Sequence, residues 1–227
     1  AKAFRENWVP LFEECYEYAV PQRESFYYEE AGQRRDDKIF DETAVVGVQE
    51  FASRLQAGIV PNFARWADFI SGSEVPPEQR DSVDNELDEV TDYVFEVIQN
   101  SNFGQEVHES FIDLAVGTGV LCVEEGDSVN PVVFSAIPLP QVVLDTGPDD
   151  RIAHVFRKRA KVEIDHLEMM YPNSTFAPEV MNLKGGNNTT DVLEVVCRNY
   201  ARVNEEAYFH YAICMRTSTL LHKKEMA

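Results

Sequence analysis

The sequence predicts an α+β fold, in which N-terminal helices precede a mostly antiparallel β-rich part with one short helix. Two patterns carry this prediction. Up to residue 117, apolar side chains recur every three to four residues, the period of a helix with one buried face. From residue 120, short apolar runs alternate with turn residues, which is typical of strands. The sequence is therefore divided into a helical part, 1–117, and a β-rich part, 118–227.

The first two helices are bounded by prolines. The first spans residues 2–20 and ends at Pro21, with Pro10 as an alternative start of its first turn. Residues 22–40 are dense in charged and aromatic side chains and are expected to form a long loop that docks against a neighbouring subunit. Asp41 is expected to cap the second helix, which Pro61 ends.

An aromatic cluster follows Pro61, and a long acidic helix follows the cluster. The cluster is expected to join the hydrophobic core; it consists of Phe63, Trp66, Phe69 and Ile70. Residues 73–82 are interpreted as a linker, and the third helix is expected from Ser82. Its apolar stripe consists of Val83, Leu87, Val90, Val94 and Val97 or Ile98, and its acidic face of Asp84, Glu86, Asp88, Glu89, Asp92 and Glu96. Such spacing favours a solvated face over acid–base chemistry or cation binding, since no glycine-bearing calcium loop accompanies it.

The fourth helix leads directly into strands. Asn102 is expected to cap it, with Gln105 as the capping-box partner. Gly117 is expected to end it in a left-handed conformation, and Gly119 to permit close backbone packing. Gly117-Thr-Gly119 is not a phosphate-binding loop, because it lacks GK[ST] and follows a helix where a Rossmann loop follows a strand.

The β-rich part contains a series of short apolar runs. A buried strand is expected at Val120–Val123, and the Pro138 and Pro140 pair is expected to interrupt strand pairing. The remaining strands are expected at Val132–Ile137, Val142–Asp145, Ile152–Val162, Val192–Val203, Tyr208–Met215 and residues 217–222. The two runs before residue 217 are expected to pair as a hairpin, and a short helix is expected from Ile164 to Tyr171.

The charge is strongly negative and unevenly distributed. The formal net charge of −20 argues against a nucleic-acid-binding domain that works by neutralising phosphates. This net charge is compatible with a protein that surrounds DNA without binding it tightly. Residues 1–150 carry 9 basic and 31 acidic side chains, whereas residues 151–227 carry 11 and 9. Such asymmetry is typical of surfaces that meet different partners, or of copies that attract each other; a solvated acidic face is the simpler alternative.

The densest basic run lies on the strand expected at Ile152–Val162. On a strand, Arg157, Arg159 and Lys161 share one face. Three interpretations stay open: contact with the acidic helices of a neighbouring copy, contact with DNA phosphates, and a solvated edge strand guarded by charge. The candidate residues for a subunit interface or a DNA-facing surface are Arg151, Arg157, Lys158, Arg159 and Lys161.

No catalytic, cofactor-binding or metal-binding residue is predicted. The sequence contains no HExxH, GxSxG or DFG motif. Its four cysteines form no CxxC pair, and its five histidines show no metal-ligand spacing. No apolar run is long enough to span a bilayer, so no membrane partner is expected.

The order of these elements resembles the N-terminal part of the portal, or head-to-tail connector, proteins of short-tailed bacteriophages. The segments that carry the resemblance are DETAVVGVQEFASRLQAGIVPNFARWADF, SNFGQEVHESFIDLAVGTGVLCVEEGD, FSAIPLPQVVLDTGPDDRIAHVFRKRAKV and LEMMYP. Asp41, Thr43 and Ala44 stand at the opening of an early helix, and Gly117-Thr-Gly119 at the helix-to-strand turn. The resemblance spans about residues 5–172, and it lies in order and spacing more than in any one motif.

The resemblance implies a structural protein that is not an enzyme and uses no cofactor. Such proteins form a homo-oligomeric ring, usually of twelve copies, at one capsid vertex. A terminase pumps double-stranded DNA through the ring, the DNA later leaves through it, and the ring contacts capsid protein and a tail adaptor. The expected location is the virion, after assembly in the host cytoplasm. The helices would belong to the wing, and stem, clip and crown would follow residue 227.

Two other classes of function stay open. One is an acidic adaptor or scaffolding protein that binds other proteins. The other is a metal-dependent hydrolase whose ligands come from the acidic cluster between Asp84 and Glu96.

Overall fold

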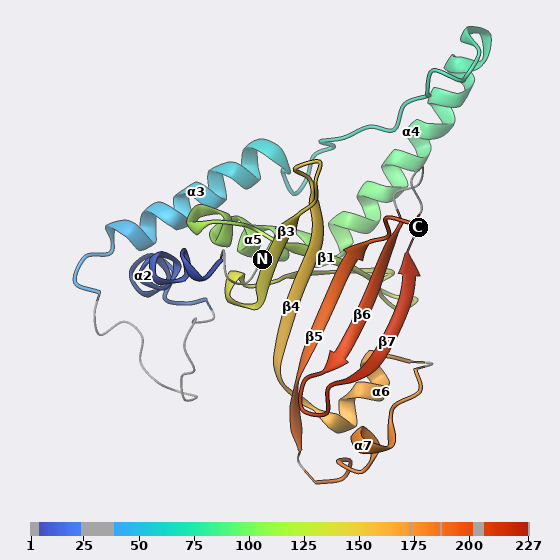
Figure 1. Cartoon of the computed structure of the whole chain (residues 1–227). Helices are drawn as coiled ribbons and strands as arrows, with labels where there is room; N and C mark the ends of the chain where they lie inside the picture. The colour runs from blue at the N-terminus through green and yellow to red at the C-terminus, as the bar shows by residue number, and fades with distance from the viewer. Residues whose placement is uncertain (1–4, 24–38, 173, 187, 202–206, 227) are drawn as a thin grey trace. The chain divides into compact units, whose positions relative to one another are not determined.

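The computed structural model of the chain describes residues 5–23, 39–172, 174–186, 188–201 and 207–226. The chain folds as two compact units, one of Val9–Pro140 and one of Ala1–Trp8 with Gln141–Ala227. In the described residues, the first unit contains four helices and a two-stranded sheet, and the second a five-stranded sheet with short helices; Figure 1 shows these elements. Helices precede antiparallel sheets, so the predicted α+β class is confirmed.

The helical unit is organised around its last helix. Its helices are α2 (Val9–Ala19), α3 (Thr43–Ile59), α4 (Pro77–Asn100) and α5 (Phe103–Val116). Helix α5 contributes Ile112 to a cluster with Val20 and Ala52, and contributes Phe103 and Val107 to a second cluster. Because one face of α5 belongs to both clusters, this helix joins α2 and α3 to the strands that follow it.

A short hairpin completes this unit. Strands β1 (Leu121–Glu125) and β2 (Val132–Ala136) pair antiparallel. Phe134 packs into the core beside Phe103, with ring centroids 5.0 Å apart. The Asn102 amide holds the Phe134 backbone on both sides: Nδ2 donates to the carbonyl at 2.7 Å, and Oδ1 accepts from the N–H at 2.9 Å. The expected buried strand is only partly buried, since Val123 is 60% exposed.

Several helix boundaries differ from those predicted. Helix α4 begins at Pro77 and not at Ser82, because a proline is well tolerated in the first turn, where its missing N–H is not needed. Glu42, and not Asp41, occupies the N-cap position of α3, but Asp41 Oδ1 still accepts a 2.8 Å hydrogen bond from the Thr43 N–H. Asn102 is the N-cap residue of α5 without a capping hydrogen bond from its side chain.

The turn after α5 confirms one glycine role and corrects the other. Gly117 has φ −168°, which is extended backbone, so the predicted left-handed stop is wrong. Gly119 is required for close approach: a Cβ at this position would lie 2.5 Å from the backbone oxygen of Ser110. The chain can therefore pass from α5 into β1 alongside the last turns of α5 only if residue 119 has no side chain.

The second unit is a five-stranded antiparallel sheet in the order β3-β4-β5-β6-β7. The predicted strands are present and β5 pairs with β6 as expected, but β5 ends at Arg198 instead of Val203. Residues 202–203 of the predicted strand, like residues 24–38 of the predicted docking loop, lie outside the described residues. The strands are β3 (Val142–Thr146), β4 (Ile152–Glu163), β5 (Thr189–Arg198), β6 (Tyr208–Cys214) and β7 (Thr219–Met226). The 3-10 turn η1 (Leu139–Gln141) precedes β3, and η2 (Ile164–His166), α6 (Leu167–Met170) and α7 (Pro178–Met181) lie between β4 and β5.

One face of this sheet carries the core of the second unit. Val192, Ala212 and Cys214 on β5 and β6 are buried against the segments that connect β4 to β5. Those segments contribute Ile164, Leu167, Tyr171 and Val180. The short helices therefore cover one end of one sheet face.

Candidate interaction surfaces

The basic strand lies inside the sheet. Strand β4 pairs with β3 on one side and with β5 on the other, so it is not an edge strand, and the interpretation as a charge-guarded edge is wrong. Arg157 and Arg159 point to the same face as predicted, because both contact the same carboxylate, that of Glu194 on β5. The structure thus gives Arg157 and Arg159 a shared partner within their own sheet.

Glu194 is the centre of this polar cluster. Its Oε2 lies 2.9 Å from Arg159 Nε and 3.6 Å from Arg157 Nη1, and its Oε1 accepts a 2.7 Å hydrogen bond from the Tyr171 hydroxyl. Burial raises the pKa of Glu194, but the Tyr171 hydrogen bond and the two guanidinium groups outweigh burial, and the net pKa is lowered. Burial beside this carboxylate raises the pKa of Tyr171. The cluster holds a charge inside the sheet and presents none outward.

The other three predicted residues lie apart from this cluster. Lys158 Nζ is 2.7 Å from Asp191 Oδ2, and Lys158 is still exposed. The Lys161 N–H donates to Asp191 Oδ1 at 3.1 Å, and its φ of 53° marks a bulge that takes it out of the Arg157–Arg159 row. The exposed Arg151 lies in the turn before β4. The five residues therefore do not form one basic surface.

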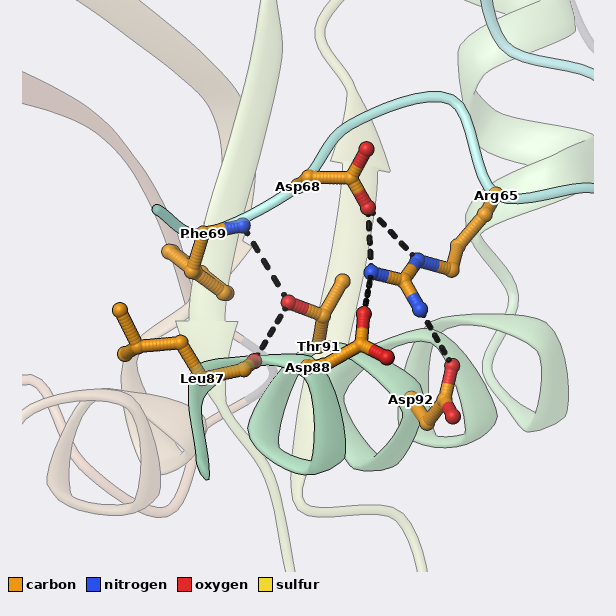
Figure 2. Close-up of polar contacts among 7 residues, drawn as sticks. All are labelled: Arg65, Asp68, Phe69, Leu87, Asp88, Thr91 and Asp92. Carbon is orange, nitrogen blue, oxygen red and sulfur yellow. Dashed lines mark hydrogen bonds and ion pairs between the residues drawn. The ribbon is translucent and has the colours of Figure 1, made fainter. Parts of the chain in front are cut away.

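An extended segment, which we call the strap (residues 61–72), lies along α4 and is held there by polar contacts. The Arg65 guanidinium reaches Asp68 on the strap and two carboxylates of α4, as Figure 2 shows. Its Nε donates to Asp68 at 2.8 Å and its Nη1 to Asp92 at 2.9 Å, and its Nη2 contacts Asp88. Hydrogen bonding to Asp88 raises the pKa of Arg65, so this charge is permanent.

Two backbone contacts fix the rest of the strap. The Phe69 N–H donates to Thr91 Oγ1 at 3.2 Å, and Thr91 in turn donates to the Leu87 carbonyl at 2.7 Å (Figure 2). The Ser71 N–H donates to Asp84 Oδ1 at 2.8 Å, and this bond lowers the pKa of Asp84. The predicted solvated face of α4 is therefore divided: Asp84, Asp88 and Asp92 hold the strap.

The strap aromatics do not form the predicted core cluster. Trp66 alone packs inward, with its ring centroid 5.2 Å from that of Phe95 and 6.0 Å from that of Phe103. Phe63, Phe69 and Ile70 are exposed, Phe63 by 92%. Every residue from 62 to 70 is exposed, and Trp66 itself keeps 39% of its surface accessible.

Sequence reasoning missed a buried ionic cluster at the end of α2. Asp113 on α5 is fully buried and accepts hydrogen bonds from the Tyr16 hydroxyl and from Arg23. Arg23 also contacts Glu109, one helical turn before Asp113. Burial, followed by the Asp113 charge, raises the pKa of Tyr16. No local pattern predicted this cluster: Glu109 and Asp113 are four residues apart, but neither belongs to the apolar stripe of the predicted helix.

Within the described residues, neither a metal-ligand group nor a membrane-spanning helix is found. No group of three or more His, Cys, Asp or Glu side chains in these ranges could hold a metal ion. His108 borders a polar cleft and is held by two glutamine side chains, at 3.1 Å from Gln56 and 3.4 Å from Gln49. Within the same described part of the chain, no helix has the length and apolarity needed to cross a bilayer. The surfaces described above are suited to contacts between proteins.

Comparison with known proteins identifies the family. No curated protein matches the chain. A family model described as bacteriophage head to tail connecting protein matches residues 1–216, which is nearly the whole chain. Members of that family are structural parts of the phage particle that connect its head to its tail. The helical unit, the sheet unit and the contact surfaces described above are thus parts of a connector, and the chain belongs to the family of bacteriophage head to tail connecting proteins.

Proposed function

We propose that the protein is a portal subunit, of which about twelve copies form a ring at one vertex of the capsid. Terminase drives double-stranded DNA into the head through this ring, and the DNA leaves through it at infection. The tail adaptor and the capsid protein bind the same ring. The observation that carries the proposal is the family match over residues 1–216.

The distribution of charge supports a ring. A closed ring of identical subunits uses one heterologous contact, so each subunit needs two different surfaces that fit each other. Residues 1–150 carry 31 acidic and 9 basic side chains, and residues 151–227 carry 9 and 11. One region of the chain can therefore attract the other region of a neighbouring copy.

The same charge suits a channel for DNA. A protein with a net charge of −20 does not gain affinity by releasing counterions from phosphates. DNA passing through a ring of such subunits is repelled by the wall and held by no base-specific contact. Non-specific passage of this kind requires no sequence recognition from the chain.

The five basic candidates contribute unequally to this proposal. Arg157 and Arg159 contact Glu194 in their own sheet, so they are poorly placed to bind an outside partner. Lys158 is exposed and is the best placed of the five for a subunit contact. We retain Arg151 and Lys161, which are also exposed, as candidates for the subunit interface or for a surface that faces DNA.

The alternative of a metal-dependent hydrolase finds less support. Arg65 already occupies the space between Asp88 and Asp92, where a metal ion would have to bind. Calorimetry with Mg²⁺ and Mn²⁺ tests this alternative. We expect no binding heat; tight binding that disappears with Asp88→Asn plus Asp92→Asn would favour the hydrolase.

The location of the protein in the particle separates a portal from an acidic adaptor or scaffolding protein. We expect the subunit to assemble in the host cytoplasm and to stay in the mature virion at the portal vertex. Immunogold labelling of purified, partly opened virions should mark a single site where head and tail meet. Label spread over the head interior, or label lost on maturation, would favour a scaffolding role.

A further inference from the structure

The second face of the five-stranded sheet, which we call the open face, is defined by the strand register. Residues that face each other on antiparallel strands point to the same side of a sheet. One cross-strand row consists of Val143, Phe156, Val195, Tyr211 and Lys223. The row on one side of it consists of Lys158, Leu193, Ile213 and Leu220, and the row on the other side of Asp145, His154, Cys197, Phe209 and Glu225.

The open face has an apolar centre bordered by charged side chains, and it lies outside the cores. The residues of the intervening rows, such as Val192, Ala212 and Cys214, are fully buried under the short helices. In contrast, none of the core clusters found in the described chain includes an open-face side chain. Val195 and Tyr211, in the middle of the sheet, keep part of their surface accessible, and Leu220 is 49% exposed. A contiguous apolar sheet face of this kind marks an interaction site.

Two lysines flank the apolar rows of the open face. Lys223 Nζ lies 5.0 Å from the ring centroid of Phe209 and 5.6 Å from that of Tyr211, so its charge is held over the open face. Lys158 is at the other side, on β4, three strands away; it is exposed, and its Nζ also lies 2.7 Å from Asp191 Oδ2 on β5. Neighbouring strands are about 4.8 Å apart, so the two lysines are separated by about 14 Å. A fitting partner presents an apolar centre between acids at a similar spacing.

Helix α4 has a surface with these properties on the side away from the strap. With about 3.6 residues per turn, Val90 and Tyr93 share one side of the helix with Glu86, Glu89 and Glu96. We call these five residues the outer stripe. Val90 is 48% exposed and Tyr93 is 67% exposed. From Glu86 to Glu96 the helix rises about 15 Å, so one stripe can reach both lysines at once.

The negative charge of α4 also favours contact with a positively charged surface. It contains eight acidic residues and one basic residue; the acids are Glu78, Asp81, Asp84, Glu86, Asp88, Glu89, Asp92 and Glu96, and the base is Arg80. Thr91 and Phe95 are its only buried residues in the described chain. Like charges three or four positions apart destabilise a helix, and Arg65 compensates only the side that bears Asp88 and Asp92. Glu86, Glu89 and Glu96 have no ion-pair partner among the described residues.

We propose that the outer stripe of α4 in one copy docks on the open face of the sheet in the next copy. Val90 and Tyr93 cover the apolar rows, while the flanking glutamates meet Lys158 and Lys223. Placing a helix on an uncovered sheet face is the usual way to bury that face. The contact is heterologous, so it propagates around a ring; in this respect it rests on the portal ring proposed above.

A charge swap tests this contact in the full-length protein. The helix variant is Glu89→Lys and the sheet variant is Lys223→Glu. Each alone should raise the protein concentration at half-assembly about threefold or more, measured by light scattering and native mass spectrometry, because the altered pair recurs at every interface. The matched controls are Asp81→Lys, on another side of α4, and Lys224→Glu, which faces the opposite side of the sheet in register with His210. Both controls should assemble like the wild type.

Mixing the two variants shows whether the helix on the open face comes from the next copy or from the same chain. In an alternating 1:1 mixture, each helix with Glu89→Lys meets a sheet with Lys223→Glu, and each unaltered helix meets an unaltered sheet, so assembly should return to the wild-type concentration. The proposal would be overturned if the mixture failed to assemble while a single chain carrying both changes assembled normally. That result would show that α4 covers the sheet of its own chain. Single variants that assemble like the wild type would also overturn it, while leaving the portal ring intact.

Two further outcomes are distinguishable. A wild-type protein that never assembles contradicts the portal function itself, and the inference with it. If thermal unfolding shows that one of the variants is unstable, a second swap of Glu86→Lys with Leu220→Glu uses exposed positions on the same two surfaces, with the same expectations.

Discussion

Glu194 shows how a charged residue can have a structural role inside a sheet. It lies on a central strand, where it is almost completely buried, and three side chains on two other segments satisfy it. A buried carboxylate of this kind links β4, β5 and the segment that bears Tyr171. Removing one partner of a buried ion pair leaves the others unsatisfied, which is costly.

Glu194→Gln should lower the free energy of unfolding at pH 7 by about 3 kcal/mol. The folded-state pKa of Glu194 lies below its ordinary value of 4.5, so its stabilisation is present above that pH and is lost as the pH falls through the folded pKa. The difference between wild type and variant should therefore shrink below about pH 4. Denaturant unfolding at about pH 7 and about pH 3 measures it. A difference that is equal at both pH values would contradict the assigned role.

Gly119→Ala should destabilise the helical unit by about 1–3 kcal/mol, because the new methyl group would overlap the backbone of α5. Gly47→Ala is the matched control: no atom lies within 4 Å of the position that its methyl group would take on α3, and alanine should stabilise the helix by about 0.5–1 kcal/mol. Thermal unfolding of both variants gives the comparison. Equal stability of the two would show that the turn does not depend on this close approach.

At the scale of elements, the strap is stabilised by its contacts with α4 and not by regular secondary structure. Arg65 brings Asp68 to Asp88 and Asp92, and two backbone N–H groups are satisfied by Thr91 and Asp84. Phe63 and Phe69 are exposed on the strap, whereas Trp66 packs against Phe95 and Phe103. One side of α4 is thus used internally, and the opposite side is left for a partner.

Arg65→Ala should release the strap from α4 without unfolding the unit. The amides of Phe69 and Ser71 should then exchange with solvent faster, because their acceptors Thr91 and Asp84 no longer face a fixed backbone. Arg54→Ala, which removes only the exposed pair with Glu50 on α3, is the control and should leave both rates unchanged. Hydrogen exchange measured by NMR gives both rates. Unaltered protection of both amides in the Arg65 variant would mean that the guanidinium does not hold the strap.

The elements with clear periodicity were predictable from sequence, and those that depend on distant contacts were not. The hairpin of β5 and β6 follows from alternating apolar runs around a turn, and α3 ends where Pro61 requires. The aromatic spacing of the strap favours a core cluster, whereas its conformation depends on residues 13 to 27 positions away. Strand order likewise placed Arg157 and Arg159 beside Glu194, and no local pattern contains that information.

At the scale of the whole molecule, each unit presents one of the two surfaces that the proposed contact would use. The helical unit has the acidic outer stripe of α4, and the sheet unit has the open face flanked by Lys158 and Lys223. Membership of the connector family gives these surfaces a context, since a ring repeats one pair of complementary surfaces around its axis. Weak individual charge pairs become effective when the ring repeats them.

The central claim, that this chain is a subunit of a closed ring, is tested most directly by native mass spectrometry of the full-length protein. We expect a single dominant mass at an integral multiple of the subunit mass, near twelve, which dissociates as the salt concentration rises because surface charge pairs are screened. A protein that stays monomeric at every concentration and ionic strength, or that forms open chains without a preferred number of subunits, would contradict the account.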